Sequence, residues 1–533
     1  MVYDRLGPAL LATFDANGSF GLSSNLVNIG GTETPATAPR ITGLTGMNNI
    51  PTVDLAGNQM FASAPPGTFP QTFPSGSQTG AYAVYWGMDS ALKTPYSYTI
   101  DLAVARELHH DYTLEVAYVG RLSHRLLSQE DVAAPLDYVD PATHMDYYTA
   151  VQALAKVYRQ GIHSQNVTDS MFGTAARYWA DIYPNAPAGG FRIHRCTGTD
   201  SSGSAINYGS PDPVVAAYDL FCGFRNNETT AVQGIDQGFG IEDINGNSLY
   251  PKTGPYTFVD SQFAALYSWR SIGAAAYHAM QVTFRKRMTH GLQFDFNYTF
   301  SKSLDISSDA NRITAEGGLG GQVINPWNPT ALRAVSDFDA AHQFNANWIF
   351  ELPFGKGRWI AGDAHGLVEA IIGGWQLTGL GRLTSGFPIG VGNGAQWPTN
   401  WQLSGYATQI GPVKTVGASK NPDGTVNIFG NGAAAATALA SYSPDLPGLV
   451  GARNTLRGDG FAGLDLGLDK KWQMPWKESH ILQFRWEVFN ALNLTRFDVQ
   501  SLNLSITNAT NFGNYTGLLT NPRVMQFALR YEF

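Results

Sequence analysis

The stretch 292–301, LQFDFNYTFS, decides the fold class. Apolar residues occupy every second position: Leu292, Phe294, Phe296, Tyr298 and Phe300. Because successive side chains of a β-strand point to opposite faces, this strand has one apolar face and one polar face. The segment 279–288, AMQVTFRKRM, precedes it across Thr289, His290 and Gly291, so the two segments are predicted to form a tight hairpin.

Similar alternating segments recur along the chain. They are 96–106, 112–120, 341–352, 374–387, 461–471, 480–490 and 523–533. With the hairpin they make nine strands, and a short strand is possible at 1–6. Strands of soluble domains average about five or six residues, so strands of roughly ten residues point away from a soluble sandwich.

The connections between these segments alternate in length. Shorter links follow residues 106, 288, 352 and 471, whereas long segments follow residues 120, 302, 387 and 490. All long connections therefore leave one end of the sheet, as in transmembrane barrels with short periplasmic turns and long extracellular loops. The sequence predicts an all-β fold: an antiparallel, up-and-down transmembrane β-barrel. It is expected to be partial, with nine or ten long strands and with short helices in its extracellular loops.

Aromatic residues gather towards the ends of these segments. Examples are Trp348, Trp375, Trp472 and Tyr531. Amphipathic rings settle at a membrane–water boundary, so two aromatic belts are expected around the sheet.

The chain divides into two predicted regions. Residues 1–95 are expected to hold the short strand and a long, irregular extracellular loop rich in Gly, Pro, Thr and Ser. Residues 96–533 are expected to form the C-terminal part of a barrel, with a large loop insertion at 121–277. Amphipathic spacing predicts one helix in this insertion at 143–160 and a second at 169–182.

Composition excludes several classes of protein. Only 14% of residues are charged, and the 58 glycines and 24 tyrosines disfavour a helical enzyme. No stretch approaches the roughly 18 to 20 apolar residues that a membrane-spanning helix needs. A closed barrel can still cross a membrane, because it satisfies its backbone groups internally. The net charge is −8 and no basic stripe is present, so nucleic acid is not an expected partner.

No motif for catalysis, metal binding or cofactor binding is apparent. Nucleophile-elbow, zinc-protease and phosphate-loop patterns are absent from the sequence. Asp465 and Asp469 share one face of a predicted strand that has leucines on the other, so they are interpreted as charges on a watery barrel wall. The only two cysteines, Cys196 and Cys222, are expected to form a disulfide that pins a long loop; the alternative is two unpaired thiols. No enzyme activity and no cofactor are predicted.

A set of short motifs recurs in order along residues 90–533. It comprises Thr94-Pro-Tyr-Ser97, Arg106-Glu-Leu108, Tyr118-Val-Gly-Arg121, Asn297-Tyr-Thr-Phe-Ser-Lys-Ser303, Asp337-Phe-Asp-Ala-Ala-His-Gln343, Leu352-Pro-Phe-Gly-Lys356, Gly374-Trp-Gln376, Thr384-Ser-Gly-Phe-Pro388 and Glu487-Val-Phe-Asn490. Together these motifs resemble the C-terminal barrel of Oar-like TonB-dependent outer-membrane transporters.

The resemblance implies a barrel of about 22 strands with an N-terminal plug and a TonB-contacting segment. Nine or ten strands would be roughly its last half, and residues 1–20 contain no secretory signal, so Met1 is interpreted as a truncation. TonB would then be contacted only through the missing N-terminal parts. The resemblance also implies that the barrel-assembly machinery reads the terminal strand. Its alternating positions are Phe527, Leu529, Tyr531 and Phe533.

The leading hypothesis is a C-terminal barrel fragment of a TonB-dependent transporter in the bacterial outer membrane. Its partners would be outer-membrane lipid, the assembly machinery and an unknown extracellular substrate, for which an oligosaccharide or a peptide is the hypothesis. A plug-less porin or surface adhesin is the first alternative, and a secreted, soluble carbohydrate-binding β-protein is the second. Because a half barrel leaves an unpaired edge on each side, an open, curved sheet is expected instead of a closed cylinder.

Overall fold

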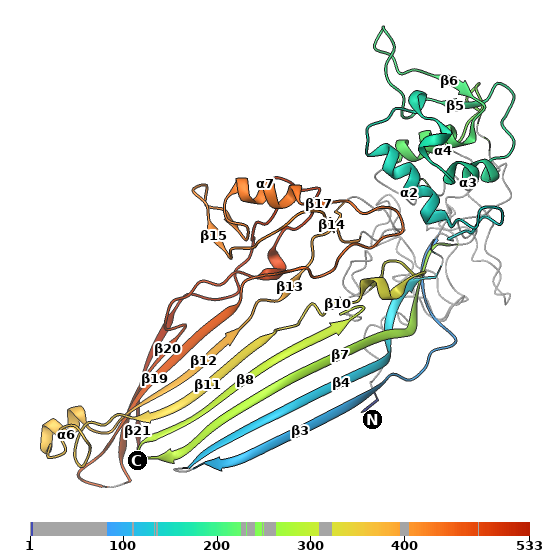
Figure 1. Cartoon of the computed structure of the whole chain (residues 1–533). Helices are drawn as coiled ribbons and strands as arrows, with labels where there is room; N and C mark the ends of the chain where they lie inside the picture. The colour runs from blue at the N-terminus through green and yellow to red at the C-terminus, as the bar shows by residue number, and fades with distance from the viewer. Residues whose placement is uncertain are drawn as a thin grey trace, which may run out of the picture.

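A computed structural model describes residues 2–3, 83–108, 111–132, 134, 137–224, 231, 240–247, 249, 263–308, 322–394, 405–477 and 479–533. Long antiparallel strands lie side by side in one sheet (Figure 1). They are β3 (Tyr96–Leu108), β4 (Tyr112–Asp131), β7 (Phe263–Thr289), β8 (Leu292–Asp305), β11 (His342–Glu351), β12 (Trp375–Thr384), β19 (Phe461–Gln473), β20 (Ile481–Phe489) and β21 (Val524–Glu532). Each pairs with the next in chain order, so all nine predicted strands and their up-and-down order are confirmed.

The sheet is open. β1 (Val2–Tyr3), within the short strand predicted at 1–6, pairs with β3 at one edge. At the other edge β21 pairs with β20, and within the described residues it has no second neighbour. The described strands therefore form an open sheet and not a closed cylinder, as expected for part of a barrel.

The two ends of the sheet differ, as the lengths of the connections predict. Short connections join β3 to β4, β7 to β8 and β19 to β20, and a link of intermediate length, residues 352–374, joins β11 to β12. We call this side of the sheet the hairpin end. At the opposite side β4, β8, β12 and β20 continue into long segments, and we call it the long-loop end. Figure 1 shows the large irregular and helical regions gathered beyond the long-loop end.

One face of the sheet is apolar across its strands. Leu114 lies opposite Phe284, and Phe284 lies opposite Phe296 on the next strand. The row continues through Ala346 on β11. Rings of one strand also pack together on this face, as in the stacked pair Phe294 and Phe296 of β8, whose centroids lie 4.4 Å apart. The register therefore aligns the apolar positions of separate strands into one surface, which is the face suited to lipid.

The opposite face is polar and internally bonded. Arg285 pairs with Asp295 at 2.8 Å, and the Thr283 hydroxyl lies 2.9 Å from Asn297 Oδ1. Asp469 on β19 lies 3.7 Å from Arg485 on β20. The two predicted faces of 292–301 are thus confirmed.

Aromatic and histidine side chains border the apolar face at both ends. Towards the long-loop end, Tyr118 bonds His278 at 2.7 Å and Tyr298 bonds His342 at 2.8 Å. At the hairpin end, Trp375 lies with its ring centroid 6.5 Å from that of Trp472. Such rings, apolar in body and polar at one edge, suit the two boundaries of a membrane.

The insertion expected at 121–277 is shorter than predicted, because both flanking strands extend past their expected ends. β4 continues to Asp131, and β7 begins at Phe263. The outer parts of β4 and β7 lie beyond the apolar band and do not face lipid. Their sequences therefore lack the alternation of apolar residues from which a strand could have been predicted. The pairing shifts register near Leu126, where a Cβ on Gly273 would lie 2.7 Å from the Leu126 carbonyl oxygen. Glycine is required at this bulge.

The irregular loop expected within 1–95 contains one further strand. β2 (Ala83–Met88) pairs in parallel with the outer part of β7. β8 leaves β7 at Ala275, so the outer part of β7 has a free edge that β2 occupies. Residues 4–82 lie outside the described part of the chain.

A helical unit stands beyond the long-loop ends of β4 and β7 (Figure 1). It contains α2 (Tyr147–Tyr158), η3 (Ser164–Asn166), η4 (Asp169–Met171), α3 (Ala175–Ile182), β5 (Phe191–Ile193), β6 (Tyr208–Ser210) and α4 (Pro213–Gly223). Fully buried side chains such as Tyr147, Leu154 and Trp179 form its core. The helix predicted at 143–160 is confirmed as α2, and the one predicted at 169–182 is divided into η4 and α3. α4 was not predicted, because it is buried on nearly all sides and has no apolar stripe.

The remaining connections carry small elements. They are β9 (Gln322–Val323), η5 (Pro329–Leu332), β10 (Ala334–Val335), α6 (Gly366–Ile372), β13 (Pro388–Ile389), β14 (Thr408–Gln409), β15 (Ser419–Lys420), β16 (Val426–Asn427), α7 (Gly432–Ala440), β17 (Tyr442–Ser443), β18 (Leu456–Arg457) and η6 (Val499–Ser501). A second core around Ile428, Phe429 and Phe512 holds the segments after β12 and β20 together. No helix in the described ranges is both long and apolar enough to cross a membrane.

Candidate functional site

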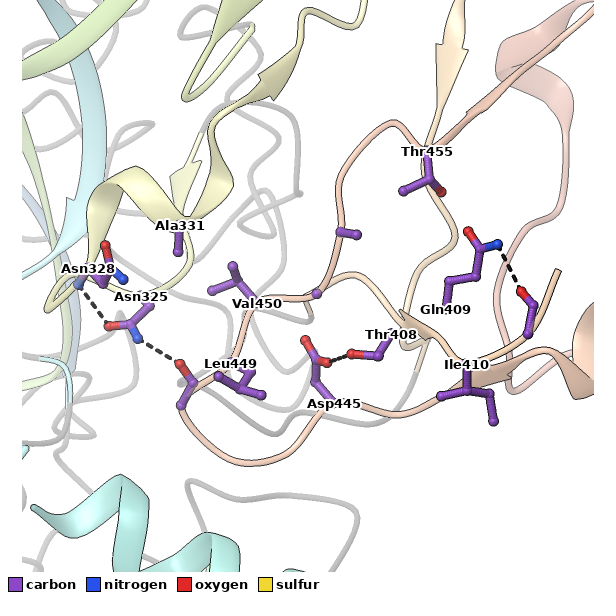
Figure 2. Close-up of a pocket in the computed structure, with 14 residues that line it drawn as sticks. Asn325, Asn328, Ala331, Thr408, Gln409, Ile410, Asp445, Leu449, Val450 and Thr455 are labelled. Carbon is purple, nitrogen blue, oxygen red and sulfur yellow. Dashed lines mark hydrogen bonds between the residues drawn. The ribbon is translucent and has the colours of Figure 1, made fainter. Parts of the chain in front are cut away.

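A pocket of about 700 Å³ opens at the long-loop end (Figure 2). Its wall combines the segment around η5 with the loop that joins β12 to β19. Asn325 and Asn328 come from the first segment, and Thr408, Gln409 and Asp445 come from the second. Its size lies in the range of small-ligand sites, which is roughly 300–1,000 Å³, and its mixed lining also fits that class.

Asp445 is the most unusual group in this pocket. Its side chain is 3% exposed, although it carries a carboxylate. The Thr408 hydroxyl donates to Oδ1, whereas Oδ2 is buried with no hydrogen-bond partner. A buried, unpaired acceptor is costly, so burial of this oxygen disfavours the charged carboxylate.

Burial also changes the proton affinity of this group. It raises the pKa of Asp445 from its ordinary 3.8 to about 6, against the opposing effects of the Thr408 hydroxyl and the Arg159 charge. Desolvation disfavours the charged carboxylate, which explains the direction. The Asp445 side chain therefore gains or loses its charge near pH 6.

The helical unit holds the Asp445 loop in place. Arg159 at the end of α2 donates to the carbonyl oxygens of Pro444 and Asp445, at 2.6 and 2.7 Å. Gln152, two turns earlier on α2, donates to the Pro447 carbonyl at 2.8 Å. Across the pocket, Asn325 Nδ2 donates to the Gly448 carbonyl at 2.7 Å (Figure 2). The pocket wall is thus fixed by groups from three distant parts of the chain.

Buried ion pairs tie the same loop to the sheet. Arg453, 8% exposed, binds Asp305 at the end of β8. Asn454 donates to Asp337 at 2.6 Å, and Arg457 pairs with Asp339. Asp337 and Asp339 belong to the motif at 337–343 noted above. Their carboxylates fasten the pocket loop to the strand region, which is a structural role.

The two cysteines lie away from the pocket. Cys196 and Cys222 form a disulfide in the helical unit, with their Cα atoms 5.7 Å apart. Beside it the buried Asp219 accepts bonds from the backbone NH groups of His194, Arg195 and Cys196. The bridge joins α4 to the segment after β5, and it closes a loop within this unit.

The terminal strand also lies far from the pocket. Phe527, Leu529 and Tyr531 are exposed on β21, and Phe533 is exposed directly after it. Figure 1 shows β21 at the edge of the sheet. Only Tyr531 makes a side-chain hydrogen bond here, to His480 at 2.5 Å. The four residues expected to act as an assembly signal therefore share one accessible face.

No sequence pattern identified the pocket residues. Asp445 lies between Pro444 and Pro447, in a stretch that reads as an ordinary turn. Asp465 and Asp469, which sequence placed on the barrel wall, lie on the polar face of β19. In the part of the chain that the structure describes, no group of three or more His, Cys, Asp or Glu side chains is arranged to hold a metal ion.

An up-and-down sheet with one lipid-suited face, one polar face and loops gathered at one end defines an outer-membrane β-barrel protein. Residues 16–526 match the family described as the outer membrane beta barrel domain. The chain belongs to this family, and its place is the outer membrane.

Several solved structures are similar in part. They include the outer membrane transporter YddB from Escherichia coli, with 8% identity, a TM-score of 0.32, and coverage of 84% of this chain and 35% of that one. FpvA of P. aeruginosa, bound to a heterologous pyoverdine and iron, has 9% identity and a TM-score of 0.30, and the match covers 84% of this chain and 29% of FpvA. The FrpB iron transporter from Neisseria meningitidis has 8% identity and a TM-score of 0.27, and the match covers 84% of this chain and 33% of FrpB. The chain spans about a third of the length of these proteins. No curated protein sequence matches it.

Proposed function

We propose that this chain forms the C-terminal part of the barrel of an Oar-like, TonB-dependent transporter, and that the Asp445 pocket captures its substrate. The observation that carries the proposal is the pocket itself, held at the long-loop end with an unpaired acceptor. Membership of the outer-membrane family supports the setting and speaks against a soluble, secreted protein. TonB coupling would come through a plug and a TonB-contacting segment that the resemblance places ahead of the barrel.

The chemistry of the pocket favours an uncharged ligand with hydroxyl or amide donors. Asn325, Thr408 and Gln409 supply neutral polar groups, while Ile410, Leu449 and Val450 supply apolar surface. Oligosaccharides and peptides both present donors next to apolar patches, so both classes fit. The Asp445 carboxylate would accept one of these donors, and such a charge-assisted bond contributes about 1.5–3 kcal/mol.

Binding to the full chain in lipid vesicles tests this proposal. The probes are a series of malto-oligosaccharides and a series of short peptides, with affinity measured by calorimetry. Asp445→Asn should weaken binding of the preferred series about tenfold or more, because the charged acceptor is lost. Asp423→Asn is the matched control, since Asp423 is an exposed acid of the same loop that does not line the pocket.

Equal affinities for wild type and Asp445→Asn would overturn the assignment of the pocket. A steady ion conductance of the same vesicles without binding of either probe series would support a plug-less porin instead.

A further inference from the structure

The turn between β11 and β12 carries a helix whose exposed side is apolar. In α6, Leu367 is 82% exposed and Ile371 is 67% exposed, and Val368 lies beside them. The acid of the same helix turns inward, where Glu369 Oε2 accepts the Lys356 backbone NH at 2.6 Å. A helix in contact with water has the reverse arrangement, with its apolar side packed and its charges outside. This surface therefore suits an apolar medium.

Three donors fix α6 against the sheet at the hairpin end. Trp375 Nε1 donates to the Ile371 carbonyl at 2.8 Å, and Trp472 Nε1 donates to the Ala370 carbonyl at 2.6 Å. Lys470 Nζ donates to the carbonyls of Ile371 and Gly373, and its side chain is 2% exposed. The lysine cation is thus stabilised by carbonyl dipoles at the end of the helix and by the two indole rings, whose centroids lie 5.3 and 5.2 Å from it.

The three donors all belong to the apolar face. Trp375 lies opposite Lys470, two residues from the pair Leu377 and Leu468 on the same face. α6 therefore docks on the lipid-suited side of the sheet, and its exposed residues continue that surface outward. Figure 1 shows α6 projecting at the hairpin end, opposite the large loops.

A further exposed ring lies in the same turn. Trp359 is 89% exposed, and Ile360 beside it is 44% exposed. A tryptophan next to aliphatic residues is typical of segments that settle where lipid headgroups meet acyl chains. We propose that Trp359, Ile360 and the exposed apolar side of α6 form an interfacial anchor in the phospholipid leaflet at the hairpin end, with the polar side of this turn, which includes Asp363, facing water. Its occupant is lipid, because the patch is continuous with the lipid-suited face of the sheet.

Depth-dependent fluorescence quenching tests the anchor in the full chain. The chain has only two cysteines and both are in the disulfide, so Ile371→Cys or Leu367→Cys gives one site for an environment-sensitive dye. The vesicles are phosphatidylethanolamine and phosphatidylglycerol with bromine near the top of the acyl chains. A dye at Met525→Cys, on the apolar face of β21, is the positive control for insertion of the sheet into the bilayer. Only vesicle preparations in which this dye is quenched are used.

The dye at 371 or 367 should lose about half of its fluorescence in the brominated vesicles, as expected for burial at the headgroup boundary. Asp363→Cys is the matched control, because it is an exposed polar position of the same turn, and its dye should stay unquenched. Equal signals at 371, 367 and 363 would overturn the proposal. A blue shift at 371 without bromine quenching would also overturn it, since protein and not lipid would then cover the helix.

Discussion

At the scale of single residues, adjacent positions of one strand should lose very different amounts of stability on the same substitution. Phe296 belongs to the apolar row and Asn297 to the polar face, where it bonds Thr283. Phe296→Arg should lower the free energy of unfolding by about 2–4 kcal/mol, the cost of a cation facing the middle of a bilayer. Asn297→Arg should cost much less. Urea unfolding in lipid vesicles measures both, and equal losses would show that the faces are assigned wrongly.

Asp445 predicts a pH dependence of stability. The pKa of this carboxyl is about 6 in the folded chain and 3.8 ordinarily, so between these values the folded form keeps a proton that the unfolded form has released. The stabilisation is complete below pH 3.8 and is lost as pH rises through about 6. It amounts to about 3 kcal/mol at most, since each pKa unit corresponds to roughly 1.4 kcal/mol.

Thermal unfolding between pH 4 and pH 7 measures this effect. The difference in stability between wild type and Asp445→Asn should change across that interval, with wild type losing stability relative to the variant as pH rises. A difference that stays constant with pH would mean that Asp445 does not titrate in this range.

At the scale of elements, the disulfide should stabilise one unit of the molecule. Cys196 and Cys222 are 26 residues apart, and closing a loop of that length contributes about 3.5 kcal/mol in the chain-entropy treatment. Cys196→Ser together with Cys222→Ser should speed hydrogen exchange in α4 and in the β5–β6 hairpin. Exchange in β8 and β11 should remain unchanged. Uniform acceleration throughout the sheet would show that the helical unit and the sheet unfold as one body.

Elements that face lipid were predictable from sequence, and the others less so. A lipid-facing strand must place an apolar residue at every second position, which is why 292–301 and its eight counterparts could be recognised. The outer parts of β4 and β7 and the strand β2 obey no such constraint. α4 is buried nearly all round, although Asp212 before Pro213 is a helix-start signal that would have found it.

The pocket around Asp445 could not be predicted from the sequence for a different reason. Asp445 acquires its properties from burial and from Thr408 and Arg159, which are remote in sequence. Its burial is a tertiary effect, and no local spacing of residues encodes it. The motif at 337–343 was noticed through a resemblance, but only the structure explains its acids, which bind Asn454 and Arg457.

At the scale of the whole molecule, the open edge formed by β21 makes the last residues accessible. Phe533 is 89% exposed there, and Phe527 and Leu529 share its face. If this strand is read during assembly by strand addition, deletion of Phe533 should reduce the amount of chain in the outer membrane several-fold. Arg530→Ala, on the other face of the same strand, is the control. The amount of each variant is measured by immunoblot of outer-membrane fractions. Unchanged levels in both the Phe533 deletion and Arg530→Ala would exclude a terminal signal at Phe533.

The length of the paired strands β4 and β7 determines how far the helical unit stands from the lipid. β7 has 27 residues and is therefore about 90 Å long, whereas the apolar band of such sheets is about 25 Å tall. Even with a tilt of about 40°, tens of ångströms of the ladder extend past the lipid. The helical unit lies beyond this extension, so it is expected to stand farther from the lipid surface than the ends of the shorter strands.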